Sequence, residues 1–222
     1  MSFGFKSVND NSYVQVDADS PRLCFLEKGS YGGTDYVATV TFAKPITTVE
    51  PPMVFIRPSE SSNTELYRSM ALSGSAGNWT GFQLSAQNIN YQPTGLWFVA
   101  TFASRGTSNF GMRLFKADGS MIYDTTASPV VVTAVFTTWT YIGAVQLTIG
   151  QTYKWTCGRG LGAGEYMMIN DFASCCQGEG GSSGTCAVSC SYSTNQTFMW
   201  STATTAWTNQ GERPLLMAKL TV

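Results

Sequence analysis

Cysteine is the residue type whose number and spacing in this chain could do the most chemistry. Four thiolates can hold zinc, but the spacing lacks the Cys-x₂-Cys pairs typical of zinc sites, so the metal signal is weak. Disulfides that fix the glycine-rich loop near 175–190 are the favoured prediction, ahead of reduced thiols and metal. Cys24 lies in an apolar run and is expected to be a buried, inert thiol. The five clustered cysteines are Cys157, Cys175, Cys176, Cys186 and Cys190.

Aromatic side chains in uncharged polar loops could stack on the faces of sugar rings. Trp79, Tyr91 and Trp207 lie in such loops, among Ser, Thr and Asn residues. They are the candidate binding residues of a glycan-recognition site. Buried or protein-interface roles are nevertheless favoured over glycan contact, because tryptophan and tyrosine are enriched in both settings.

The titratable residues do not form a recognisable catalytic set. The chain has no histidine, which excludes Ser-His-Asp and Cys-His chemistry and most catalytic zinc sites. The closest acid pairs, Asp17 with Asp19 and Glu165 with Asp171, resemble ordinary turn residues rather than a hydrolase pair. The glycine-rich run 158–164 precedes a predicted strand, whereas a phosphate cradle precedes a helix. We therefore predict no catalytic residue, no cofactor and no enzyme.

The charge content also narrows the class of partner. Charged residues make up 12% of the chain, with 13 Lys and Arg against 14 Asp and Glu. This balance lacks the basic footprint of nucleic-acid binding. Residues 69–104 and 180–211 carry no charge. Because charged residues are depleted at interface cores, we expect a homo-oligomer, with a trimer as the leading case, or contact with other proteins.

A third uncharged stretch, residues 125–153, could be mistaken for a membrane span. Thr and Gly residues interrupt it well before the roughly 18 apolar residues that a membrane helix needs. We therefore expect two buried strands and a turn in this stretch, and no membrane span.

The elements that must position all these residues are predicted to be strands. Residues 36–42 alternate apolar and polar with a period of two, and 53–57, 97–102 and 215–222 are short apolar runs rich in β-branched and aromatic residues. No window of helical length shows sustained helical spacing. The fold class predicted from the sequence is all-β.

An internal repeat divides the chain. Phe3-Gly4-Phe5-Lys6 opens a segment with an Asn/Asp turn, and Phe110-Gly111-Met112-Arg113 opens a similar one about 107 residues later, each typical of a hairpin. Three later apolar strands follow in each copy. We predict two tandem β-sandwich modules related by duplication, at 1–105 and 106–222, the second carrying the cysteine- and glycine-rich loop.

The repeated opening, Phe-Gly-x-Lys/Arg, then a polar turn, then a strand ending in Asp, resembles the N-terminal signature of minor tail proteins of long-tailed bacteriophages. The resemblance implies a structural virion component at the tail tip, baseplate or fibres, without catalytic residues. Its partners would be other tail proteins and, in host attachment, a surface receptor or polysaccharide. The N-terminus lacks a signal peptide, so we expect synthesis in the host cytoplasm. A glycan-binding module and a capsid decoration protein are the alternatives.

Overall fold

The computed structural model of the chain consists of β-strands. All eighteen regular elements in its described residues are strands, which confirms the all-β prediction. The description covers residues 6–8, 14–17, 22–60, 66–103, 109–116, 119, 121–147, 150–170, 175–177, 183–202 and 213–220.

Eight strands come from the first half of the chain and ten from the second. Those of the first half are β1 (Lys6–Val8), β2 (Val14–Asp17), β3 (Cys24–Gly32), β4 (Val37–Ile46), β5 (Met53–Pro58), β6 (Tyr67–Ser75), β7 (Asn78–Ala86) and β8 (Thr94–Thr101). Those of the second half are β9 (Arg113–Phe115), β10 (Met121–Asp124), β11 (Val130–Phe136), β12 (Thr140–Leu147), β13 (Gly150–Thr156), β14 (Tyr166–Met168), β15 (Cys175–Gln177), β16 (Ser183–Ser191), β17 (Gln196–Thr202) and β18 (Leu215–Leu220).

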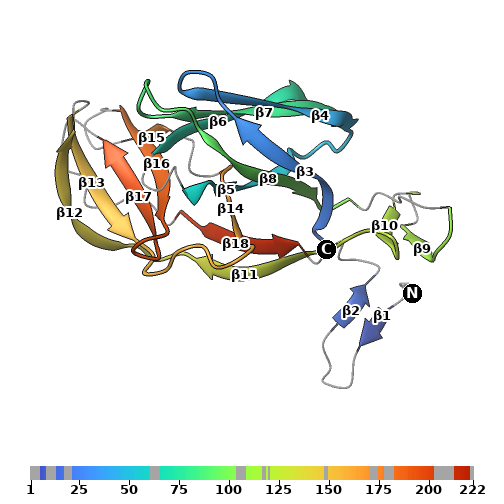
Figure 1. Ribbon diagram of the computed structural model, residues 1–222. Helices are drawn as coiled ribbons and strands as arrows, with labels where there is room; N and C mark the ends of the chain where they lie inside the picture. Colours follow the sequence, from blue (N-terminus) through green and yellow to red (C-terminus); the bar gives the residue numbers. More distant parts are fainter. Residues whose placement is uncertain are drawn as a thin grey trace.

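Two large antiparallel sheets pack together as a β-sandwich (Figure 1). The six-stranded sheet has the order β11-β18-β14-β5-β8-β3. The eight-stranded sheet has the order β12-β13-β17-β16-β6-β7-β4, with β15 paired to β16. Two hairpins, β1–β2 and β9–β10, form separate two-stranded sheets.

Both large sheets contain strands from both halves of the chain. The two halves therefore build one sandwich together, which corrects the expectation of a separate sandwich in each half. The boundary expected near residue 105 divides two sets of strands, not two sheets. The physical reason is that β5 and β6, which would be exposed edges of a separate first half, pair with β14 and β16 of the second.

The strand order is nevertheless the same in the two halves. The six-stranded sheet reads β3-β8-β5 from one end and β11-β18-β14 from the other. From one end, the eight-stranded sheet has the order β4-β7-β6. At the other end β12 is the outermost strand, and the order after it is β13-β17-β16. Corresponding strands meet in the middle as antiparallel neighbours, as a two-fold relation between the halves requires. In the described residues of the first half, β12 and β15 have no counterpart.

Side-chain contacts at the β5–β14 junction follow the same relation. Phe55 pairs directly with Met168. Arg57 Nη1 donates to the carbonyl of Glu165 at 2.9 Å, and Asn170 Nδ2 donates to the carbonyl of Pro52 at 3.0 Å. The two halves correspond at this junction with a constant offset of 113 residues. Pro52 corresponds to Glu165, Phe55 to Met168 and Arg57 to Asn170. Arg57 and Asn170 thus make equivalent hydrogen bonds in opposite directions across the junction, and we call them the two reciprocal anchors.

Apolar side chains fill both faces of the six-stranded sheet. The larger core lies between the two sheets and includes Phe82, Trp97 and Met199. The smaller core lies on the opposite face of the six-stranded sheet, where Phe55 and Phe98 stack with their ring centroids 4.5 Å apart. Trp97 and Phe98 point to opposite faces because successive side chains on a strand alternate. One sheet therefore contributes to two cores.

The two outer strands of the six-stranded sheet, β3 and β11, converge at one end (Figure 1). The amide of Val130 donates to the carbonyl of Leu23 at 2.9 Å, and Cys24 and Pro129 form an isolated antiparallel bridge. The sheet therefore curls until its edges touch, and this contact closes one end of the smaller core.

The uncharged stretch 125–153 departs from its prediction. It contains β11, β12 and the first part of β13 instead of two strands and a turn. Of these, β12 is exposed along most of its length. Apolar composition predicted burial there, but an apolar strand at the end of a sheet can also face solvent.

Candidate functional site

The aromatic residues predicted to bind glycans are tied into the fold where the structure describes them. Trp79 on β7 is half-buried, packs against the larger core, and donates its indole N–H to the carbonyl of Thr48 at 2.9 Å. The hydroxyl of Tyr91 is buried. Trp207 lies outside the described residues. Glycan contact at these three positions stays a prediction.

Tyr91 lies beside a buried pair of tyrosines. The hydroxyls of Tyr31 and Tyr67 are hydrogen-bonded at 2.9 Å, and their rings meet edge to face. Burial raises the pKa of both phenols well above the usual value near 10, and at Tyr67 the neighbouring Tyr91 adds to the rise. Both phenols therefore stay protonated at neutral pH. They serve as hydrogen-bonding groups of the core, not as bases.

A second polar contact adjoins this pair at the junction between the halves. The Tyr192 hydroxyl donates to the carbonyl of Pro58 at 2.6 Å, and its ring lies 5.1 Å from the Arg57 guanidinium. Arg57 Nη1 also donates to the carbonyl of Gly162 at 2.7 Å. Arg57 thus fastens β5 to two segments of the second half, which makes it a structural cation.

An open hollow of about 420 Å³ lies next to Arg57. Most of the exposed surface of its lining is apolar, and Glu60 is the one acid that lines it beside Arg57. Tyr31, the aromatic residue of the lining, is itself buried. The lining residues are Ser30, Tyr31, Arg57, Pro58, Ser59, Glu60, Thr94, Gly95 and Leu96.

The cysteine cluster is divided by the structure. Cys157 and Cys190 are thiols, and Cys157 Sγ donates to the carbonyl of Arg159 at 3.2 Å. Cys186 and Cys190 lie on the core-facing side of β16, and burial raises the pKa of Cys190 to about 11. The side chains of Cys175 and Cys176 lie outside the described residues. Disulfide formation at Cys157 and Cys190 is therefore corrected, and the remaining disulfide candidates stay predictions.

Glu165 is a buried acid that anchors the glycine-rich loop before β14. Its carboxylate forms an ion pair with Arg159 and accepts the amide N–H of Gly162 at 2.7 Å. Burial by itself raises the pKa of Glu165, but the hydrogen bond from the Gly162 amide and the ion pair with Arg159 help to outweigh it, so that the pKa is lowered. Asp171, the acid nearest to Glu165 in the sequence, lies outside the described residues. The visible contacts make Glu165 a structural residue.

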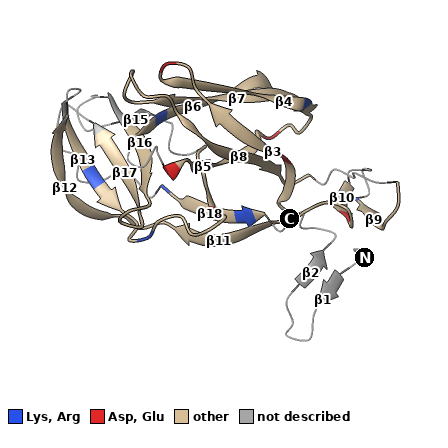
Figure 2. Ribbon diagram, in the orientation of Figure 1, with Lys and Arg blue, Asp and Glu red and all other residues tan. Residues whose placement is uncertain are grey.

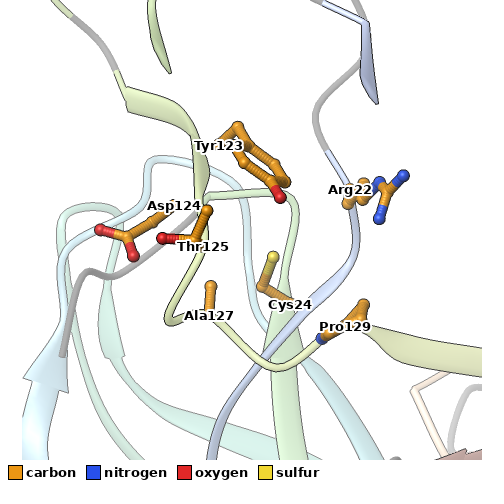
Figure 3. Close-up of a pocket in the computed structure, with 7 residues that line it drawn as sticks. All are labelled: Arg22, Cys24, Tyr123, Asp124, Thr125, Ala127 and Pro129. Atoms are coloured by element: carbon orange, nitrogen blue, oxygen red, sulfur yellow. The ribbon is translucent and has the colours of Figure 1, made fainter. Parts of the chain in front are cut away.

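A small cavity of about 170 Å³ lies where the start of β3 meets β10 and the link to β11 (Figure 3). The hydroxyl and amide of Thr126 lower the pKa of Asp124, with a further contribution from Arg113, whose Nε lies 2.6 Å from its carboxylate. The charge of the acid is thus matched within the hairpin. The lining residues are Arg22, Cys24, Tyr123, Asp124, Thr125, Ala127 and Pro129.

Exposed apolar side chains gather on the two edge strands of the second half. Three valines of β11 and three residues of β12 are each between 42% and 55% exposed: Val131, Val132, Val135, Tyr141, Ile142 and Val145. Figure 2 shows no charged residue on β12. Apolar surface of this kind on an edge strand is typical of a contact surface. We call these six residues the apolar edge.

The second hairpin region is also apolar and exposed. Phe110 is 86% exposed, and Met112 and Phe115 are exposed beside it. These residues belong to the second copy of the repeated opening motif. Exposed aromatic residues at a motif that occurs twice point to protein contact more than to a packed core.

Comparison with protein-family models, curated proteins and solved structures found no match to this chain. In the described ranges, no helix is long and apolar enough to cross a membrane. The same residues contain no group of three or more cysteine or acidic side chains placed to hold a metal ion. Function must therefore be argued from the contact surfaces of the chain itself.

Proposed function

We propose that this protein is a structural component of the tail of a long-tailed bacteriophage, located at the tail tip, the baseplate or the fibres. It assembles with other virion proteins and contributes to host attachment. The single observation that carries the assembling role is the apolar edge, because exposed apolar strands need a protein partner to cover them.

The tail assignment is supported by the opening motif. Its basic and acidic positions are opposite one another in both hairpins, Lys6 with Asp17 and Arg113 with Asp124. The same 107 residues separate the two basic and the two acidic positions. In the second hairpin the pair forms a salt bridge with a nitrogen-to-oxygen distance of 2.6 Å. The spacing of the motif thus has a physical meaning, since it places a basic and an acidic residue at opposite positions of a two-stranded sheet.

The repeated strand order supports an origin by duplication, which we propose as part of this assignment. Equivalent strands meet antiparallel in the middle of both sheets, and Arg57 and Asn170 make reciprocal contacts there. A fused pair of modules is a rigid part with two similar sides, which suits a protein that joins others in an assembly.

Purified particles of the phage that encodes the chain test the proposal. We expect mass spectrometry to detect the protein in washed particles, and cryo-electron microscopy to place it in the tail. Absence from particles that otherwise contain a complete set of tail proteins contradicts the proposal. Density on the capsid surface instead of the tail supports a decoration protein.

Host attachment is tested separately from assembly. The variant Trp207→Ala is expected to leave particle assembly intact and to reduce adsorption to host cells if this ring contacts a surface polysaccharide. Normal adsorption by assembled Trp207→Ala particles removes that residue from the attachment role. Trp79→Ala is a poor probe, since Trp79 packs against the core.

A further inference from the structure

Strand β12 is an addition to the repeated fold. Strand β13, not β12, occupies the position that β4 holds in the first half, and in the described part of the chain β12 pairs with β13 alone. Every residue in 140–146 except Gly143 is exposed, and neither core includes a residue of 140–146. A strand that buries so little contributes little to the stability of its own sandwich.

The opposite edge of the same sheet, β4, is protected against pairing. Both carboxylate oxygens of Glu27 accept the amide N–H of Ala43 at 3.0 Å, so this amide is already bound. Lys44 adds a charge and Pro45 lacks an amide hydrogen. A bound amide, a lysine and a proline on one edge are features by which natural sheets prevent further strands from adding.

The β12 edge lacks such protection over most of its length. Residues 140–147 contain neither a charged residue nor a proline. A bulge between Tyr141 and Gly143 interrupts the register with β13, and from Gly143 to Leu147 the pairing is regular. The regular part of the β12 edge is therefore 143–147, and Ile142 and Val145 add exposed apolar surface to it.

We propose that β12 is the self-association strand of this protein, pairing antiparallel with β12 of a second copy so that the eight-stranded sheet continues across two molecules. Addition to the β4 edge of another copy is opposed by Glu27, Lys44 and Pro45. The open edge that matches β12 is the same edge of a second copy. That contact is isologous and brings no charged residues of β12 together.

The middle of the molecule already contains this kind of contact. There, corresponding strands of the two halves join antiparallel in both sheets. The association through β12 repeats that arrangement between chains. This inference rests on the assembling role proposed above and identifies a second copy of the chain as the partner. A two-fold contact gives a dimer, whereas the sequence favoured a trimer.

The test compares wild-type protein with Val145→Lys and with a matched control, Val49→Lys. Val145 is 43% exposed and Val49 is 72% exposed, so neither lysine needs to enter a core. Sedimentation velocity is measured over about 1 to 100 µM, because association depends on concentration. We expect a dimer for wild type and for Val49→Lys, and a dissociation constant raised on the order of tenfold or more for Val145→Lys.

Hydrogen–deuterium exchange gives an independent reading. In wild type, exchange of the amides in 143–147 is expected to slow as concentration rises, and in Val145→Lys it should not. A monomer at the highest concentration overturns the inference, as does an oligomer that Val145→Lys leaves unchanged. Whether the protein is present in phage particles is measured separately. If the protein does not dimerise, the tail assignment is unaffected. If the protein is absent from particles, the inference of a dimer is unaffected.

Discussion

At the scale of single residues, the buried polar groups of this protein hold segments of the chain together. Glu165 fixes a glycine-rich loop, Trp79 binds a backbone carbonyl, and the Tyr31–Tyr67 pair fills a polar position inside the larger core. Judged from its residue type alone, each of these residues could have belonged to a binding or catalytic site. Each proves to be satisfied by neighbouring groups of the same chain, which is the usual state of a buried polar side chain.

The first prediction concerns the stability supplied by Glu165. We expect Glu165→Gln to lower the free energy of unfolding at pH 7 by about 2 kcal/mol, because Arg159 loses its partner and the hydrogen bond from Gly162 weakens. Urea unfolding followed by tryptophan fluorescence measures the change. Unaltered stability would mean that the loop does not depend on this carboxylate.

The pH dependence of stability gives a second prediction. Because the pKa of Glu165 is lowered in the folded protein from its usual 4.5, its contribution is present above about pH 4.5 and is lost as the pH falls through the folded value. The wild-type protein should therefore lose more stability than Glu165→Gln between pH 5 and pH 3, roughly the range in which such a carboxyl titrates. Equal losses in the two proteins would contradict it.

The third prediction concerns the reactivity of the thiols. Burial and the raised pKa keep Cys190 protonated, so it should resist alkylation in the native protein at pH 8, an ordinary labelling condition well below about 11. Denaturation without reductant should then allow both Cys157 and Cys190 to react. Peptide mass spectrometry measures both steps. A disulfide-linked peptide containing either residue would contradict it.

At the scale of elements, the junction between the halves depends on two reciprocal anchors. Arg57 leaves β5 to bind the loop before β14, and Asn170 leaves the end of β14 to bind the start of β5. Backbone pairing between β5 and β14 is short, with two paired positions. The side chains therefore supply much of the specificity with which these strands meet.

The fourth prediction follows from this short pairing. Arg57→Ala and Asn170→Ala should each lower the free energy of unfolding by about 2 kcal/mol, since each removes two hydrogen bonds to the backbone across the junction. Arg22→Ala, at an exposed arginine outside the junction, is the matched control and should change stability little. Chemical denaturation measures all three. A control variant as unstable as Arg57→Ala would show that the effect is not specific to the junction.

Much of the local structure could be predicted from the sequence, because hairpins and alternating strands depend on neighbouring residues. Lys6 and Asp17 bracket a recognisable turn, and residues 36–42 alternate as a half-buried strand should. Contacts between distant residues could not be predicted in this way. Phe55 and Met168 are 113 positions apart, and no local pattern specifies that they pair.

The candidate site shows the same limit. The loop around Tyr91 is polar in sequence, but its hydroxyl is buried beside Tyr67, which lies 24 positions earlier in the chain. The opposite error occurred at β12, where apolar residues predicted burial and the strand is exposed. Composition measures how strongly a side chain avoids water, and it does not say whether the covering surface belongs to the same chain.

At the scale of the whole molecule, the two halves share both large sheets and the larger core. The larger core contains residues from both halves, including Phe82 and Trp97 of the first and Trp155 and Met199 of the second. Neither half can lose its strands without exposing edges and core surface of the other. Shared sheets therefore couple the stability of the halves much more strongly than a flexible linker would.

The fifth prediction tests this coupling. Differential scanning calorimetry should give a single unfolding transition whose calorimetric and van't Hoff enthalpies agree, because the halves unfold together. Arg57→Ala should shift that transition without splitting it. Two resolved transitions, one for each half, would contradict a shared sandwich.

The contact between β3 and β11 has a consequence for how the molecule meets a partner. Each opening hairpin immediately precedes one of these strands, with β2 ending at Asp17 and β10 at Asp124. Because Leu23 and Val130 touch, both hairpins emerge from the same end of the sandwich (Figure 1). A ligand with two matching sites could engage both at once, and the second attachment would then benefit from a high effective concentration. Both copies of the opening motif are thus placed where a single partner could contact them together.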